Sequence, residues 1–176
     1  MQFNLNRPEQ DYPKFYLCFE RDISYSGEVS WQRTEVRVEV RNIQSLPIKV
    51  GRLKQLADFV LKKEGVRDGY ISIALVDDQR IKEINRVYAK IEKPTDVLSF
   101  DLSEKDYFIG DIIISVETAQ RKAKEVDWSL EKEVGLYLVH GILHLVGYDD
   151  QKKKDYLRMK KREEEIVRDF FKEEGD

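Results

Sequence analysis

The sequence predicts an α/β (or α+β) domain in which one mixed sheet of about four strands packs with five or so helices. The first observation is periodicity, because short apolar or alternating runs are interspersed with longer segments whose apolar residues recur at helical spacing. The second is order, because strands and helices alternate at first and three helices follow, which favours a single mixed sheet. A length of 176 residues fits one domain.

The first strand and the first helix have clear patterns. Glu35–Arg41 alternates strictly, as a half-buried strand does. Val50–Glu64 is predicted to be a helix, and Gly65 stands where a helix C-terminus favours glycine. The apolar residues at helical spacing are Leu53, Leu56, Ala57, Val60 and Leu61.

The middle of the chain predicts the centre of the sheet. Tyr70–Val76 is nearly apolar throughout, which is typical of a central strand. Asp77 is suited to cap the helix that follows, and Lys90–Thr95 reads as a loop. The apolar positions of that helix are Ile81, Ile84 and Val87.

Two further strands precede the final helices. Val97–Phe100 and Ile109–Ile114 are separated by a polar turn at Ser103–Tyr107, and Ser115 is expected to cap the next helix. Three helices are then predicted, at Val116–Val126, Leu130–Val146 and Lys152–Lys172. The last is rich in charges of both signs, and we expect its docking stripe to contain Tyr156, Leu157, Ile166 and Phe170.

The domain organisation follows from where these patterns begin. Residues 35–176 are predicted to form a single domain. Residues 1–34 contain aromatic residues without a clear period, together with Pro8, Pro13 and Gly27, so we treat them as an N-terminal extension of uncertain order.

Composition limits the environment and the partners. Lys and Arg number 31 against 34 Asp and Glu, so any nucleic-acid contact would need a local basic patch. A single cysteine, Cys18, excludes an internal disulfide framework and fits a reducing compartment. The start lacks a signal-peptide pattern, and no apolar run approaches the ~20 residues of a membrane span. We therefore expect a cytoplasmic protein without a membrane partner.

The candidate metal ligands stand close together in the sequence. The two histidines of the chain, His140 and His144, are four residues apart and would share one face of a helix. Gly147 is suited to end that helix, and Asp150 follows at the spacing of a third ligand. The alternative is a pair of core histidines with satisfied hydrogen bonds.

The spacing matches the zinc pattern HExxHxxGxxH of metalloproteases, with two departures. Gly141 stands where such a protease needs its general-base Glu, and Asp150 replaces the third His. A carboxylate is an acceptable zinc ligand, and three protein ligands leave a fourth position for water.

The segment HGILHLVGYDD resembles the H-G-x-L-H-L-x-G-Y-D-H signature of the YbeY endoribonucleases, a family of bacterial single-strand RNA nucleases. Asn85 and Tyr88, PTDVLSF at Pro94–Phe100 and GDIIIS at Gly110–Ser115 stand in the order and spacing of the same family. The resemblance covers roughly residues 36–165.

The resemblance implies a zincin-like fold and one bound Zn²⁺, with His140, His144 and Asp150 as ligands. It also implies hydrolysis of single-stranded RNA in rRNA maturation, at the 3′ end of 16S rRNA, and in ribosome quality control. The implied partners are rRNA and ribosomal particles, with no DNA. The family usually has His in the third position, and the added negative charge of Asp150 should make a bound water less acidic or favour another metal.

A second departure concerns a cation. The family usually has arginine directly after the tyrosine that corresponds to Tyr88, whereas this chain has Ala89. Arg86 and Lys90 are the candidate catalytic cations that could substitute. The general base is not assigned.

Several other polar residues have two interpretations each. Thr95, Asp96 and Ser99 face a cleft or belong to a loop that enters a core strand. Asp111 is a site residue or a turn carboxylate. Glu133, seven residues before His140, is a partner for an imidazole N–H or a favourable charge in the first turn of a helix.

The start of the final helix has two interpretations, and the ribonuclease function has two alternatives. Lys152–Lys154 contact phosphates or form a solvated helix start. A metalloprotease or another zinc hydrolase is the first alternative to the ribonuclease, and Gly141 argues against protease chemistry. The second alternative is a ribosome-associated binding factor with a structural zinc, which the Ala89 departure leaves open.

Overall fold

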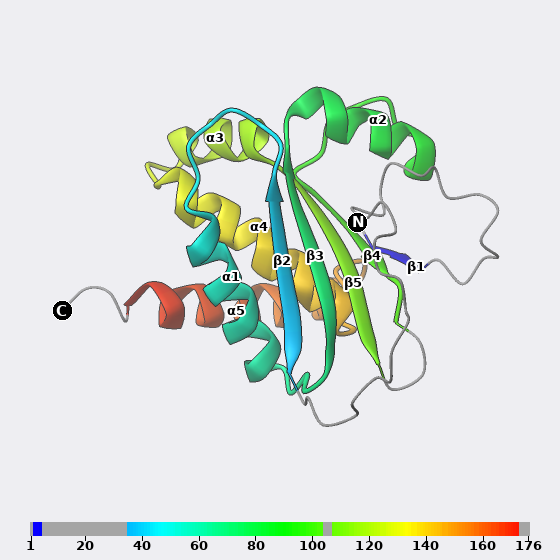
Figure 1. Cartoon of the computed structure of the whole chain (residues 1–176), viewed down its shortest axis with the longest axis vertical. Coiled ribbons are helices and arrows are strands. Elements are labelled where there is room, and N and C mark those ends of the chain that lie inside the picture. Colours follow the sequence, from blue (N-terminus) through cyan, green and yellow to red (C-terminus); the bar gives the residue numbers. More distant parts are fainter. Residues whose placement is uncertain (1, 5–34, 104–106, 173–176) are drawn as a thin grey trace, which may run out of the picture.

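The computed structural model describes residues 2–4, 35–103 and 107–172. Five helices surround one sheet (Figure 1). The strands are β1 (Gln2–Asn4), β2 (Val36–Asn42), β3 (Gly69–Val76), β4 (Val97–Asp101) and β5 (Phe108–Ser115). The helices are α1 (Val50–Lys63), α2 (Asp78–Ala89), α3 (Val116–Glu125), α4 (Leu130–Leu145) and α5 (Lys153–Lys172).

The sheet is mixed, as predicted, and its strand order is β1-β4-β5-β3-β2. β2, β3 and β5 run parallel to one another, whereas β4 runs antiparallel to β5. β2 to β5 are the four strands expected from the sequence. β1 is a fifth strand, because residues 2–4 pair in parallel with β4 at the outer edge of the sheet.

Local sequence signals account for the ends of the helices. Asp77 caps α2 by accepting a hydrogen bond from the Arg80 backbone amide at 2.8 Å, as predicted. Ser115 caps α3 in the same way through the amide of Thr118, at 3.2 Å. Gly65 follows α1 with φ +77°, the left-handed backbone for which glycine is favoured.

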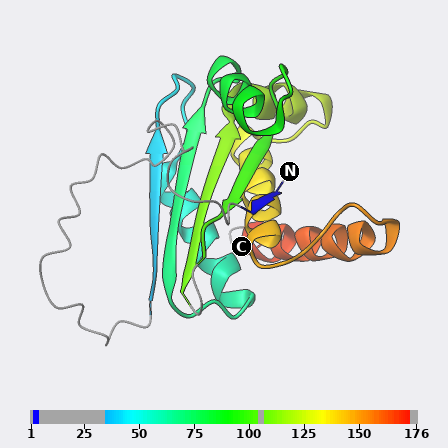
Figure 2. The ribbon, with the colours of Figure 1, turned by 90° about the vertical axis from the view of Figure 1, so that its right-hand side faces the viewer.

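The two faces of the sheet carry separate apolar cores. The larger core joins α1, α3, α4 and α5 to one face. The smaller core packs α2 on the opposite face through Ile81 and Ile84, against Leu98, Phe100 and Ile113. Because side chains alternate along a strand, β4 and β5 contribute to both cores. Figure 2 shows α4 and α5 on the same side of the sheet.

Some of the residues discussed from the sequence are not described by the structure. Cys18 and most of the expected N-terminal extension lie outside the described residues, as do residues 104–106 of the predicted polar turn. Within the described part of the chain, none of the helices combines the length and the apolar character needed to cross a bilayer.

Candidate metal centre

Helix α4 brings the two histidines beside the sheet. Ser129 caps its first turn through the Lys132 amide, at 3.2 Å. The helix ends after Leu145, and Gly147 turns the chain back with φ +98°, as its place in the motif predicts. This turn returns Asp150 to the helix face that carries His140 and His144.

A close approach between α4 and the sheet explains the glycine between the histidines. A Cβ atom on Gly141 would lie 2.9 Å from Ser99 Oγ and 3.0 Å from Ile112 Cδ1. Position 141 therefore faces β4 and β5, not the two imidazoles. A glutamate at this position would have no room, so the glycine is a packing requirement of this fold.

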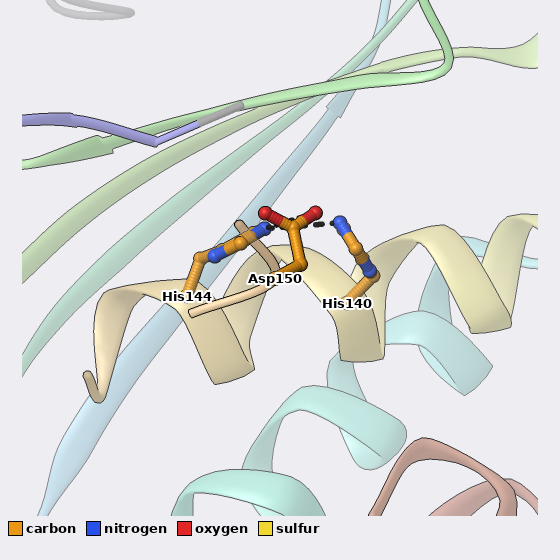
Figure 3. Close-up of side chains that lie close together, drawn as sticks. All are labelled: His140, His144 and Asp150. Atoms are coloured by element: carbon orange, nitrogen blue, oxygen red, sulfur yellow. Dashed lines mark hydrogen bonds and ion pairs between the residues drawn. The ribbon is translucent and has the colours of Figure 1, made fainter. Parts of the chain in front are cut away.

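Three ligand atoms converge on one point (Figure 3). The Nε2 atoms of His140 and His144 are 3.1 Å apart, and His144 Nε2 lies 3.6 Å from Asp150 Oδ2. All three ligand atoms lie within 4.8 Å of one another. Ligands about 2.0–2.1 Å from a tetrahedral metal ion are roughly 3.3 Å apart, so the distances and the donor types fit one small divalent ion.

The second nitrogen of each imidazole has an acceptor. His144 Nδ1 lies 3.1 Å from the carbonyl oxygen of Tyr148, and His140 Nδ1 lies 2.6 Å from Glu163 Oε1. A carbonyl or carboxylate oxygen accepts, so each Nδ1 donates and each Nε2 is left to present its lone pair. Two lone pairs that face one another repel, and a cation between them relieves this repulsion. Such outer partners are typical of metal-binding histidines.

The electrostatic setting of the centre also suits a metal ion. Burial, and then the neighbouring His140, lower the pKa of His144. The neutral imidazole is the form that binds metals. The side chain of His144 is 3% exposed, whereas that of Asp150 is 42% exposed. The centre is therefore buried on the α4 side and open to solvent on the Asp150 side.

The imidazole partner differs from the one considered from the sequence. Glu133 lies beside Tyr137 in the first part of α4, and burial raises the pKa of its carboxyl. The partner of His140 is Glu163, which reaches it from α5. One signal could have identified Glu163, since it lies four residues after Met159 and three before Ile166, on the buried face of α5.

The polar residues of PTDVLSF lie in the turn before β4 and in the buried part of that strand. Thr95 Oγ1 donates to Asp96 Oδ1 at 2.9 Å, and the same oxygen accepts the Val97 amide at 2.9 Å, so this pair shapes the turn that enters β4. Ser99 is buried beneath Gly141. Its hydroxyl has no hydrogen-bond partner among the described residues.

Asp111 lies on the other face of the sheet. Its neighbours in β5, Gly110 and Ile112, face Leu145 and Gly141 of α4, so the alternation of a strand directs Asp111 away from the metal centre. It is paired in register with Ser72 of β3. Burial raises the pKa of Asp111 to about 7, while a hydrogen bond with Ser72 acts in the opposite direction.

The two candidate cations belong to α2 and its C-terminus. Arg86 is exposed on α2. Lys90 caps the helix with φ 60°, and its Nζ donates to the Val87 carbonyl at 3.0 Å. Among the described residues, no hydrogen bond or ion pair joins either of them to the three candidate ligands. Their catalytic role stays a prediction.

Comparison with known proteins identifies the family of this chain. The family model described as endoribonuclease YbeY matches residues 35–171. A protein of that name from Aquifex aeolicus is 40% identical over 126 residues, which covers 70% of this chain and 83% of the relative. A second, from Heliobacterium modesticaldum, is 43% identical over 132 residues, with 66% and 80% covered.

A solved structure has the same fold. The solution structure of TM1509 from Thermotoga maritima matches with a TM-score of 0.57 and 30% identity, and the match covers 78% of this chain and 90% of that one. The family match spans most of the chain, including all three candidate ligands and Glu163. The chain therefore belongs to the endoribonuclease YbeY family.

Proposed function

We propose that this endoribonuclease cleaves single-stranded RNA with one zinc ion held by His140, His144 and Asp150. Membership of the family makes the chain a hydrolase that acts on RNA. The observation that carries the proposal is the convergence of three ligand atoms within 4.8 Å, with both imidazoles oriented by outer partners.

The chemistry of the proposed site follows from its shape. A bound zinc ion supplies Lewis-acid stabilisation at phosphorus and a more acidic water molecule. The side chain of His144 is buried, so its side of the site is shielded from solvent. The exposed side of Asp150 leaves room for a phosphodiester to approach from solvent. An open side of this kind supports a catalytic centre over a closed structural zinc site.

Charge that develops on the phosphate requires cations from the protein. We retain Arg86 and Lys90 as candidates for this role, because Ala89 replaces the usual arginine of the family. Replacement of each with alanine should slow RNA cleavage and leave the bound metal in place. Unchanged rates in both variants would remove them from the mechanism.

The natural substrate is proposed from the family resemblance. It implies rRNA within ribosomal particles, with maturation of the 16S rRNA 3′ end and ribosome quality control as the processes. This substrate would place the protein in the cytoplasm. Fractionation of a cell extract on a sucrose gradient tests the association, and absence of the protein from every ribosomal fraction would contradict it.

A cleavage assay tests the proposed activity directly. Zinc-loaded wild-type protein and the His144→Ala variant, purified identically, are incubated with a labelled single-stranded RNA. We expect cleavage by the wild type only, and one zinc per chain in the wild type only. Equal cleavage by both proteins would assign the activity to a contaminant, and a wild type that binds zinc without cleaving would overturn the proposed activity.

The same assay separates the alternatives. Protease chemistry is disfavoured, because position 141 faces Ser99 and Ile112 and has no room for a general-base glutamate. The departure at Ala89 keeps the ribosome-associated binding factor open as an alternative. Association with ribosomal particles, zinc binding and no turnover would support that function in place of the nuclease.

A further inference from the structure

We infer that the first half of α5, with Lys152 directly before it, forms a docking surface for single-stranded RNA next to the metal centre. This inference rests on the proposed function and names the surface through which the substrate would be held. The α5 platform consists of exposed side chains, namely Lys152, Lys153, Lys154, Tyr156, Arg158 and Lys160.

The platform is strongly basic in an acidic protein. Residues 152–161 contain six basic residues and one acidic residue, while the whole chain has a net charge of −3. No ion pair joins any cation of the platform to a carboxylate in the part of the chain that the structure describes. Further along α5, by contrast, Arg162 is paired with Glu64 at 2.7 Å and with Glu165 at 2.9 Å. The positive charge of the platform is therefore available to phosphates.

The first half of α5 also exposes Tyr156, which belongs to the platform, and its neighbour Leu157, although the sequence pattern assigned both to a docking stripe. That expectation was wrong for two of its members, since Tyr156 is 46% exposed and Leu157 is 54% exposed. The prediction is confirmed for Ile166, which is buried with Met159 and Val167, and for Phe170, which packs against the same core. Lys160 Nζ lies 6.0 Å from the centre of the Tyr156 ring. An exposed ring beside a cation is the combination that stacks bases and holds the phosphate backbone of a single strand.

The platform is tied to the metal centre at both ends. Asp150, a candidate ligand, lies two residues before Lys152, and Glu163 lies three residues after Lys160 and contacts His140. In Figure 2 the first turns of α5 (orange) extend from the body of the protein, beyond α4. A strand of RNA bound there would lead toward the open, Asp150 side of the centre.

A single-stranded nucleic acid fits this surface better than a membrane does. A helix that lies on a membrane inserts a continuous apolar face. The apolar face of α5 is buried against the rest of the protein, so Tyr156 and Leu157 are the large apolar side chains that its first half leaves exposed. An anionic membrane would meet the same lysines, and the experiment below separates the two partners.

Binding is measured with the full chain in the His144→Ala background, so that the probe stays intact. The probe is a fluorescein-labelled oligouridylate of about 12 nucleotides, within the range that one binding surface covers. The test variant carries Lys152→Gln, Lys153→Gln and Lys154→Gln. The control variant carries Lys54→Gln, Lys82→Gln and Lys124→Gln, which removes the same charge from exposed positions elsewhere.

We expect the platform variant to bind the oligouridylate about tenfold more weakly at low salt, with the slope of log K against log salt reduced by about 2. The control variant should stay within about twofold of its parent. Tyr156→Ala should weaken binding about tenfold, whereas Tyr156→Phe should not, because the ring provides the stacking. In the zinc-loaded, cleaving protein, the platform substitutions should raise KM and leave kcat unchanged.

Equal losses in the platform and control variants would overturn the inference, because net charge alone would then explain binding. So would unchanged RNA binding combined with lost binding to vesicles of equimolar phosphatidylcholine and phosphatidylglycerol. The experiments test the platform and the proposed activity independently. If the wild type binds RNA through the platform without cleaving it, only the activity is overturned. If cleavage depends on His144 but its KM is unchanged by the platform substitutions, only the platform is overturned.

Discussion

His140 Nδ1 lies 2.6 Å from Oε1 of Glu163, and this contact fastens α5 to the candidate metal centre on α4. The carboxylate orients the imidazole and raises its basicity as a ligand. Replacement Glu163→Gln should lower zinc affinity about 10- to 100-fold while the fold is kept. Competition with a chromophoric chelator measures this affinity.

The neighbouring, exposed Glu164 provides the matched control. Glu164→Gln changes the charge by the same amount without touching an imidazole. Equal zinc affinities for wild type, Glu163→Gln and Glu164→Gln would show that the carboxylate does not act on the metal centre.

The close approach of α4 to the sheet predicts a packing defect at Gly141. A Cβ at this position would meet Ser99 Oγ at 2.9 Å and Ile112 Cδ1 at 3.0 Å. Gly141→Ala should therefore lower the free energy of unfolding by about 1–3 kcal/mol, as overpacking of a core does. Urea unfolding followed by circular dichroism measures the change.

A second substitution tests the cause of that defect. Ser99→Ala removes one of the two close atoms, and the hydroxyl it removes is buried without a partner among the described residues. The double variant with Ser99→Ala and Gly141→Ala should recover part of the lost stability. Additive effects of the two substitutions would contradict the proposed clash.

The raised pKa of Asp111 predicts that the stability of the folded protein depends on pH. Burial raises the pKa of its carboxyl to about 7 in the folded protein. The folded state thus holds this proton more tightly than the unfolded chain does. The stabilising contribution of the protonated carboxyl to the free energy of unfolding is therefore present below about pH 4 and is lost as the pH rises toward about 7. Asp111→Asn should be more stable than wild type at neutral pH, with the advantage shrinking in acid.

Denaturant midpoints measured at several pH values between about 4 and 8 check this expectation. Asp68→Asn, at an exposed position, serves as the control. If Asp111→Asn and wild type change stability in parallel across this range, Asp111 does not hold the proton that the structure assigns to it.

The proposed role of Asp150 as the third ligand predicts which substitutions this position tolerates. A histidine there would offer a nitrogen donor that zinc also accepts, whereas alanine offers no donor. Asp150→His should retain one zinc per chain, and Asp150→Ala should lose most of it, as measured by metal analysis after dialysis. Full zinc retention by Asp150→Ala would remove Asp150 from the ligand set.

We propose that residues 35–176 form a domain that folds without residues 1–34. The family match begins at residue 35, and among the described residues the earlier segment contributes only β1, which pairs with β4. A chain that starts at residue 35 should unfold cooperatively and retain its zinc, with a lower Tm because the edge of β4 is exposed. Non-cooperative unfolding would contradict the proposed boundary.

The sequence determined the features that depend on neighbours along the chain. Alternation and helical spacing predicted β2 to β5 and the five helices, because burial of one face imposes a period on each element. The caps at Asp77 and Ser115 were predictable for the same reason, since a cap acts within one turn. The pairing of His140 with His144 also follows from one helical turn.

Only the tertiary structure decided the contacts between distant segments. Glu163 meets His140 because α5 docks on α4 through Met159, Ile166 and Val167, and no local period specifies that partner. The packing of Gly141 depends on how closely α4 approaches the sheet. β1 is too short for a recognisable period, and its pairing with β4 depends on an edge that exists only after the sheet has formed. Local periodicity fixes which face of an element is buried, but the docking of whole elements decides what that face meets.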